Sequence, residues 1–197
     1  MTKIISGATM SLDGYIAGPE ESGFDRLFQW YGNGDVELPS ANPGISFRLT
    51  EASAKHWREV LETTGALVVG RHLFDITSGW GGRHPIGVPV VVLTHRVPDD
   101  FESESFVFVT EGGIEAAVAK ARELAGDKDV VVNGGQMAEQ ALQAGLLDEI
   151  GVDLVPVLLG GGTPFFDALG APVDLEGPIS TIQGDRVTHL RYRVVGQ

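Results

Sequence analysis

The chain has 197 residues, of which 43% are hydrophobic, and its 27 Asp and Glu outnumber 14 Lys and Arg to give a net charge of −13. It has no cysteine, which excludes disulfides and thiolate chemistry, and its charge argues against a nucleic-acid or membrane-surface partner because a polyanion would repel it. We expect one domain over residues 1–197. The N-terminus lacks a secretory pattern and no apolar run reaches the roughly 20 residues of a membrane span, so we also expect a cytoplasmic protein.

Short β-branched runs alternate with helical patterns along the chain. We expect strands, several of them apolar throughout, at residues 4–10, 66–69, 88–93, 106–109, 130–132 and 150–155. Helices are expected after Thr50, over residues 114–125 and over residues 137–144. This alternation predicts an α/β protein with a largely parallel sheet covered on both sides. Near the end of the chain, residues 179–183 and 186–195 flank Gly184 and Asp185, which predicts an antiparallel hairpin with a two-residue turn.

Residues 17–49 are typical of a long loop rich in aromatic side chains. Loops of this length are often lids or binding segments. Trp30 and Phe47 in this loop, with Phe74 and Trp80 further along, are candidates for the flat apolar walls of a site for a heteroaromatic substrate. Core packing is the competing interpretation, and it is favoured for Phe74 because that residue falls on a predicted helix.

Three of the predicted strands end in glycine, hydroxyl or basic residues. These are Gly70, Arg71 and His72; Thr94, His95 and Arg96; and Asn133, Gly134 and Gly135. Each is compatible with an ordinary turn, yet ligands of open α/β sheets bind outside the carboxyl ends of the strands. Glycine permits close approach of a phosphate, a helix N-terminus attracts its charge, and arginine binds it in bidentate fashion. In so acidic a chain these basic groups favour the 2′-phosphate of NADP over the free ribose of NAD.

Five motifs, taken in order, resemble the dihydrofolate reductase family. They begin after the first strand, follow three of the predicted strands and end in a glycine-rich segment, at residues 10–17, 69–72, 94–96, 132–135 and 156–164. Within that family the nearer likeness is to the reductase domain of the bifunctional riboflavin-biosynthesis deaminase-reductase. The resemblance implies a three-layer fold with a mixed, mainly parallel eight-stranded sheet, flanking helices and a C-terminal antiparallel hairpin. It also implies NADPH as hydride donor and a homodimer.

The resemblance further implies which residues bind the cofactor. In the family, the first two clusters grip the pyrophosphate and the 2′-phosphate, and Gly134 and Gly135 match a glycine pair, joined by a cis peptide, beside the nicotinamide. The cofactor-binding candidates are Ala8, Ile16, Gly70, Arg71, His72, Thr94, His95, Arg96, Gly134, Gly135, Gln136 and Met137. Thr9 matches a position at the substrate ring, so the substrate-binding candidates are Thr9, Trp30 and Phe47.

The chain departs from both named relatives at the residues that hold the substrate. Dihydrofolate reductases place a carboxylate on the first helix where this chain has Ala54, and the riboflavin-pathway reductases typically have Glu where this chain has Asn133. The remaining acids near the expected pocket are Asp13, in a turn, and Asp153, within an apolar strand. Either of them, or a water that it holds, is a candidate proton donor. The competing roles are turn capping for Asp13 and a structural position for Asp153.

The function predicted is NADPH-dependent hydride transfer to a small pterin- or pyrimidine-like heterocycle. The alternative is a nucleotide- or flavin-binding protein of the same fold without dihydrofolate reductase activity. No metal is expected, because His56, His84 and His189 are scattered along the chain without ligand spacing.

Overall fold

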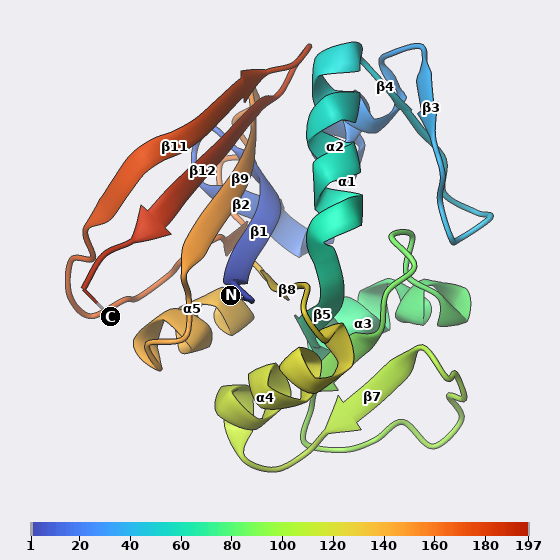
Figure 1. Cartoon of the computed structure of the whole chain (residues 1–197). Coiled ribbons are helices and arrows are strands. Elements are labelled where there is room, and N and C mark those ends of the chain that lie inside the picture. The colour runs from blue at the N-terminus through green and yellow to red at the C-terminus, as the bar shows by residue number, and fades with distance from the viewer. Residues whose placement is uncertain (1, 197) are drawn as a thin grey trace.

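An eight-stranded sheet organises residues 2–196, which are the residues that this computed structural model describes (Figure 1). The strands lie in the order β11-β12-β9-β1-β8-β5-β6-β7. All neighbours from β9 to β7 are parallel, whereas β12 is antiparallel to both β9 and β11. The strands are β1 (Ile4–Ser11), β5 (Thr64–Gly70), β6 (Val90–Leu93), β7 (Phe106–Val109), β8 (Asp129–Asn133), β9 (Glu149–Val155), β11 (Leu175–Gln183) and β12 (Thr188–Val194).

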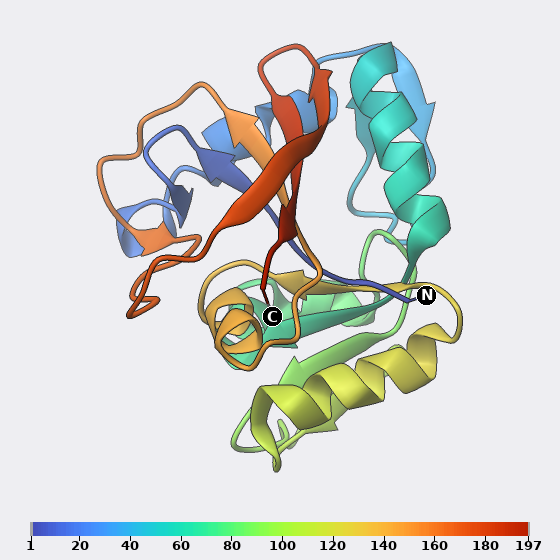
Figure 2. The ribbon, with the colours of Figure 1, turned by 60° about the vertical axis from the view of Figure 1, so that its left-hand side comes forward.

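Helices cover both faces of this sheet. In β5, Ala66 and Val68 pack with residues of α4 and α5, while Leu67 and Val69 pack on the opposite face with Phe74 of α3, so successive residues of one apolar strand enter two different cores. In Figures 1 and 2, α4 lies in the lower half of the molecule with α5 near it, and α2 lies in the upper half. The helices are α1 (Phe24–Leu27), α2 (Glu51–Thr63), α3 (Arg71–Ile76), α4 (Gly113–Ala125) and α5 (Gln136–Gln143). The predicted three-layer α/β fold with a terminal hairpin is confirmed.

The hairpin of β11 and β12 differs from the prediction in its turn. Gln183 pairs with Thr188, which leaves the four residues 184–187 between the strands in place of the predicted two. The Gly184 amide donates to the Val187 carbonyl at 2.9 Å. Val187 is 1% exposed and packs with Ala54 of α2 and Val155 of β9. The longer loop thus places an apolar side chain in the core, and its burial stabilises the loop.

The segment 17–49 contains short elements and is not a single loop. Most of its aromatic side chains are at least partly buried, and Trp30 and Phe47 are 1% and 2% exposed, so the segment folds by packing onto the sheet. The elements are η1 (Pro19–Glu21), α1, η2 (Gln29–Gly32), β3 (Val36–Leu38) and β4 (Phe47–Leu49), with β3 and β4 paired antiparallel. Outside it, η3 (Ser78–Gly82) follows α3, and β2 (Tyr15–Ala17) pairs with β10 (Thr163–Pro164).

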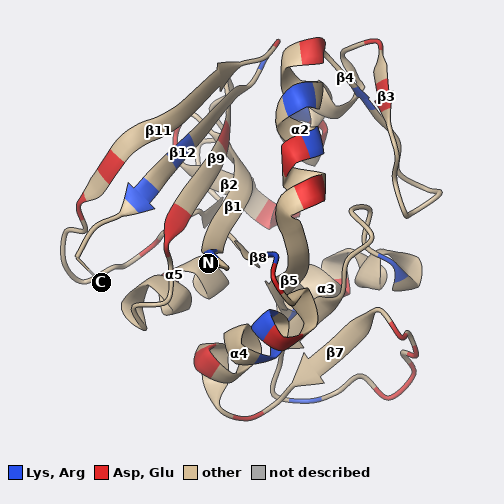
Figure 3. Cartoon of the chain, in the orientation of Figure 1, with Lys and Arg blue, Asp and Glu red and all other residues tan. Residues whose placement is uncertain are grey.

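Charged side chains are spread over the surface. Figure 3 shows acidic residues on α2, on α4 and in the loop before β7, with the basic residues dispersed between them. Across residues 2–196, none of the helices has both the length and the hydropathy that crossing a membrane requires.

Candidate active site

The three strand ends singled out in the sequence are neighbours in the sheet. β8 pairs with β5, and β5 pairs with β6, all in parallel, so the carboxyl ends of the three strands lie along one edge. Asn133 ends β8, Gly70 ends β5, and Thr94 follows β6. The fold thus brings together the clusters that begin at these residues, and β1 lies on the other side of β8.

Arg71 and Arg96 line a common cavity of about 370 Å³ at the β5–β6 end of this edge. The Arg71 guanidinium donates to the Arg96 carbonyl at 2.9 Å and pairs with Asp75 at 2.7 Å, while Arg96 pairs with Asp99. Both guanidinium groups are at least one third exposed, so an anion in the cavity can compete with these surface carboxylates. Two arginines at one cavity fit a bound phosphate.

The neighbouring residues of the two basic clusters have other contacts. Thr94 is buried, and its hydroxyl donates to the Arg96 carbonyl at 2.9 Å, so it shapes the loop that carries Arg96. The His72 ring, on α3, lies 2.6 Å from the Glu21 carboxylate of η1, while His95 is exposed. His72 therefore joins α3 to the segment after β2.

The glycine pair after β8 makes a tight turn against β1 and β2. Gly135 has φ of 77° and precedes α5, which begins at Gln136. A Cβ placed on Gly134 would lie 3.1 Å from the Ala8 Cβ and 3.3 Å from the Ile16 Cδ1, so a side chain here would push these neighbours by a few tenths of an ångström. The predicted nicotinamide positions Ala8 and Ile16 therefore do lie beside the glycine pair.

The expected cis peptide in this turn is corrected. The Gly134–Gly135 peptide is trans, and Gly177–Pro178 is the cis bond recorded among residues 2–196. Gly135 makes the turn through its positive φ. The turn therefore needs no cis bond between non-proline residues, and such a bond costs roughly 3 to 4 kcal/mol. The Gly135 amide is also not free for a phosphate, since it donates to the Phe165 carbonyl at 2.9 Å.

Met137 has a packing role between two of the strand ends. It is 8% exposed, and a Cβ on Gly70 would lie 3.5 Å from its Cγ. Met137 thus fills the space between the β5 and β8 ends. Because Gly70 has no side chain, the Met137 side chain can lie close to the backbone at the end of β5.

Asp13 caps a turn. The Ser11 hydroxyl donates to its carboxylate at 2.6 Å, and the amides of Leu159 and Gly160 donate to it at 3.1 and 2.7 Å. The hydrogen bond from Ser11 is the main reason why the pKa of Asp13 lies below its ordinary value, and the two amides add to the effect. A carboxylate held ionised in this way does not fit the predicted role of proton donor.

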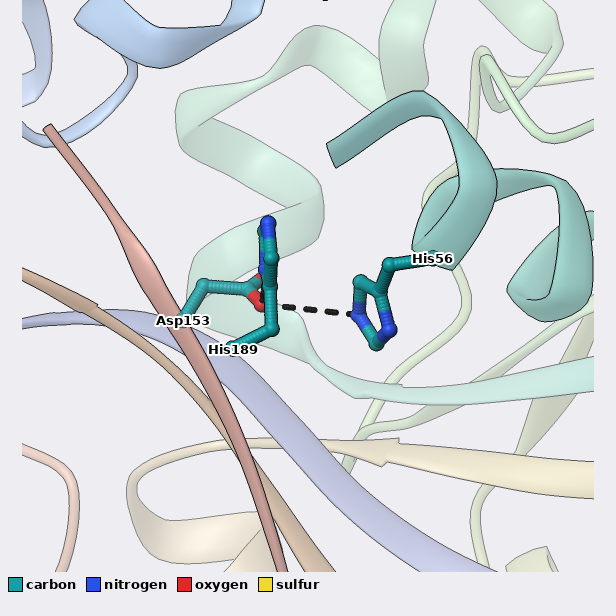
Figure 4. A group of neighbouring side chains, drawn as sticks. All are labelled: His56, Asp153 and His189. Atoms are coloured by element: carbon teal, nitrogen blue, oxygen red, sulfur yellow. Dashed lines mark hydrogen bonds and ion pairs between the residues drawn. The ribbon is translucent and has the colours of Figure 1, made fainter. Parts of the chain in front are cut away.

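Asp153 lies in a cluster with two histidines (Figure 4). It stands on β9 in register with Thr9 of β1 and His189 of β12, so the three side chains share the face of the sheet that α2 covers. The His189 Nδ1 lies 2.6 Å from Asp153 Oδ1, and the His56 Nε2, from α2, lies 3.7 Å from the same oxygen. The two imidazole rings are stacked with centroids 4.3 Å apart.

Ser53 completes this cluster from the next turn of α2. Its Oγ lies 2.9 Å from His189 Nε2, and both residues are buried. The sequence reasoning missed Ser53, His56 and His189. A signal was present for His189, since an antiparallel partner of the strand at 150–155 places a residue opposite Asp153. No local sequence pattern indicates that His56 lies near Asp153.

Burial governs the protonation of the cluster. Desolvation lowers the pKa of His56, the Asp153 carboxylate partly opposes this, and the nearby His189 and Arg191 lower it further. Desolvation also raises the pKa of the Tyr31 phenol, helped by Asp153 and opposed in part by a hydrogen bond with Thr9. Thr9 and Asp153 thus face a protonated phenol on one side and, on the other, an imidazole whose neutral form burial favours.

Although His56 and His189 are far apart in the sequence and lack ligand spacing, the fold brings them together, and their ligand atoms and that of Asp153 lie within 4.8 Å of one another. The ring planes nevertheless differ by only 24°. Because the lone pair of an imidazole nitrogen lies in the ring plane, two stacked rings do not point at one ion. The 2.6 Å contact between His189 and Asp153 is a hydrogen bond, and the arrangement suits proton transfer better than metal binding.

Trp30 and Phe47 do not form open walls for a substrate. They are 1% and 2% exposed and pack with Tyr31 and Trp57. The Trp30 ring also meets His189 edge to face at 5.1 Å. These aromatic residues therefore pack against one side of the polar cluster, at His189. Phe74 is buried, so its assignment to the core is confirmed.

Comparison with known proteins extends over nearly the whole chain. The family model described as the RibD C-terminal domain matches residues 2–188. YwjB of Bacillus subtilis (strain 168), an uncharacterized protein, is 22% identical over 167 residues, which is 85% of this chain and 84% of YwjB.

Solved structures with the same fold support this match. A protein from Shewanella sp. PV-4 named for riboflavin biosynthesis has a TM-score of 0.74 at 23% identity, covering 99% of this chain and all of its own. The Thermotoga maritima diaminohydroxyphosphoribosylaminopyrimidine deaminase/5-amino-6-(5-phosphoribosylamino)uracil reductase has a TM-score of 0.60 at 14% identity, covering 98% of this chain and 56% of its own. Dihydrofolate reductase from Enterococcus faecalis, complexed with NADP(H), has a TM-score of 0.53 at 17% identity and covers 98% and 97%.

At these identities the solved structures show the fold alone. The family model spans every strand of the sheet as far as the start of β12. The chain therefore belongs to the RibD C-terminal domain family.

Proposed function

We propose that this chain is an NADPH-dependent reductase that transfers a hydride to a small heterocycle of the pterin or pyrimidine class. One observation carries the proposal: three neighbouring strand ends bear a glycine turn at one end and two arginines around one cavity at the other. The similar folds of a reductase complexed with NADP(H) and of a uracil-type reductase support the cofactor and the substrate class.

The proposed cofactor groove runs along the ends of β8, β5 and β6. Arg71 and Arg96 would bind the 2′-phosphate, with Gly70, His72, Thr94 and His95 around the adenosine and pyrophosphate. Gly134, Gly135, Gln136 and Met137 would adjoin the nicotinamide with Ala8 and Ile16. NADPH supplies the hydride, so the protein has to orient the acceptor and deliver a proton.

Asp153 is the proposed proton donor, and Thr9, its neighbour in register, is the proposed substrate contact. The contacts of Asp13 leave it without that role. We further propose one domain over residues 1–197 that forms a homodimer in the cytoplasm. Sedimentation velocity measures the assembly, and a monomer at micromolar concentration would contradict the homodimer.

Thermal-shift titration with NADPH, NADH and FMN tests the cofactor first, because a ligand that binds only the native state raises its apparent stability. Arg96→Ala should weaken NADPH roughly 10- to 100-fold, about 1.5 to 3 kcal/mol, with little change for NADH. Arg122→Ala, on the exposed face of α4, is the matched control and should change neither. Equal losses for both cofactors would contradict the 2′-phosphate assignment.

The alternative is a nucleotide- or flavin-binding protein of the same fold without turnover. NADPH oxidation with a panel of pterins and pyrimidines separates the two functions. Tight NADPH binding without oxidation by any member of the panel favours the binding protein, and selective stabilisation by FMN favours a flavin protein.

A further inference from the structure

A second cavity, of about 200 Å³, borders the histidine cluster. It lies where α2 faces β9 and β12, and both imidazoles contribute to its wall. On the same face of the sheet, Gly7 of β1 and Gly151 of β9 are partners in register, and a Cβ on either would meet no atom closer than 3.7 Å. These two glycines leave the sheet surface two residues before Thr9 and Asp153 without side chains.

The other charged groups of this cavity neutralise one another. Lys3 lies 2.6 Å from Glu149, and Arg191 lies 3.6 Å from the second oxygen of the same carboxylate. Glu59, one turn along α2 from His56, is exposed and favours the protonated form of that histidine. Apart from the exposed Glu59, the titratable side chains of the wall that take no part in these ion pairs are thus the two imidazoles.

The two histidines have different access to water. The His189 side chain is 1% exposed and is held on both sides, since Ser53 meets Nε2 and Asp153 meets Nδ1. These contacts suit an Nδ1–H that donates to the carboxylate and an Nε2 that accepts from Ser53. The His56 side chain is 16% exposed, lines the cavity and ends 3.7 Å from the Asp153 carboxylate.

We propose that His56 is the proton inlet of the reduction, carrying protons from the water of this cavity to Asp153, and that His189 is the positioning residue that holds the Asp153 carboxylate. This inference rests on the proposed reductase function. It places proton entry under α2, away from the cofactor groove at the strand ends.

The steps balance as one hydride and one proton per turnover. The carbon of a C=N or C=O group accepts the hydride that NADPH supplies, and the nitrogen or oxygen takes a proton from the carboxylic acid of Asp153. The Asp153 carboxylate then takes a proton from the imidazolium of His56, which regains one from water. The stacked rings carry one positive charge at a time, because two cations 4.3 Å apart repel each other.

The test is His56→Gln in the full chain, with His84→Gln, far from the cluster and beside Trp80, as the matched control. At a pH below the lowered pKa of His56, where the wild-type imidazole is protonated, His56→Gln should lower kcat roughly 10- to 100-fold with KM for NADPH unchanged, and added imidazole should restore part of the rate. In the wild type, kcat should fall as pH rises above the lowered pKa of His56, whereas the variant should lack this dependence. His84→Gln should match the wild type in all of these.

A readout besides turnover is the exchange of the His189 Nδ1–H proton with water, followed by NMR through its downfield resonance. His56→Gln should slow this exchange by about tenfold or more, and His56→Asn serves if the Gln variant fails to fold. Wild-type kcat or exchange in a folded His56 variant would overturn the inlet and leave the reductase intact. Wild-type protein that binds NADPH but reduces no member of the panel would overturn the reductase and the inlet with it.

Discussion

His84 sets a limit to stability in acid through its burial. Its ring meets Trp80 edge to face at 4.5 Å, and the Ile86 amide donates to its Nδ1 at 3.3 Å, which requires the neutral ring. Burial lowers the pKa of His84 to about 4, against about 6.5 in the unfolded chain. The unfolded state therefore binds one more proton between these values, so stability is complete above pH 6.5 and is lost as the pH falls towards 4.

We expect this histidine to cost about 2 to 3 kcal/mol of stability between pH 6.5 and 4, since each pH unit contributes about 1.4 kcal/mol. Urea unfolding at a series of pH values measures the slope. His84→Gln should flatten it by about one proton. Identical slopes for both proteins would show that another group titrates.

Ser53 supports the site through one buried hydrogen bond. Ser53→Ala leaves the His189 Nε2 without that partner in a buried place, so the free energy of unfolding should fall by about 1 to 3 kcal/mol. Ser180→Ala, an exposed serine on the rim of the same cavity, should change it by less than about 0.5 kcal/mol. Chemical denaturation compares the two, and equal effects would mean that the Ser53 contact is weak.

At the scale of elements, a steric restraint fixes the short strand β10 against β2. Gly162, just before β10, has φ of 116°, and a Cβ there would lie 2.1 Å from the Ala17 carbonyl oxygen. Gly160 also has a positive φ of 77°, but a Cβ there would meet nothing within 4 Å. A side chain at Gly160 would therefore cause backbone strain alone, whereas one at Gly162 would cause both strain and a steric clash.

Gly160→Ala should cost about 1 to 2 kcal/mol through strain alone. Gly162→Ala should cost about 1 to 3 kcal/mol more, because the backbone of β2 has to move. Thermal and urea unfolding of both variants measure the difference. Equal losses of unfolding free energy in the two variants would show that the backbone of β2 moves without an energetic cost.

The sequence predicts features that depend on neighbouring residues, and it does not predict contacts between residues that are far apart in the chain. The apolar strands and the strand-end residues Gly70 and Arg71 are local patterns, and the alternation of strands with helices places neighbouring ends together. Contact between His56 and Asp153 has no local pattern, because it depends on how α2 lies across β9. The position of His189 depends on the register of β12, which the longer 184–187 loop sets.

The sequence predicts where the turn at Gly134 and Gly135 lies, but it does not predict the backbone geometry of that turn. Its location follows from valines that stop at two glycines. Its trans peptide and its bond to the Phe165 carbonyl depend on a segment that is far away in the sequence. Local composition therefore locates a binding turn, while distant backbone decides which of its amides remain free.

At the scale of the whole molecule, the three tryptophans lie in two different parts of the protein that one continuous sheet connects. Trp30 and Trp57 pack beside β9 and β12, while Trp80 packs beside β5 and β6. We expect a single unfolding transition over the whole chain, because β1 and β8 tie these regions together by continuous pairing. Fluorescence of Trp80→Phe, which reports on Trp30 and Trp57, should give the same urea midpoint as circular dichroism. Separate midpoints would divide the chain into two units.

The strand order also decides when the protein can fold during its synthesis. β1 is made first, yet its partners are β8 and β9, so it waits for residues 129–155 before it gains either neighbour. β5, β6 and β7 can pair with one another earlier, but β5 keeps one free edge until β8 inserts between it and β1. A nascent chain stopped before residue 129 therefore carries an unpaired apolar strand, and we expect such fragments to depend on chaperones or be degraded.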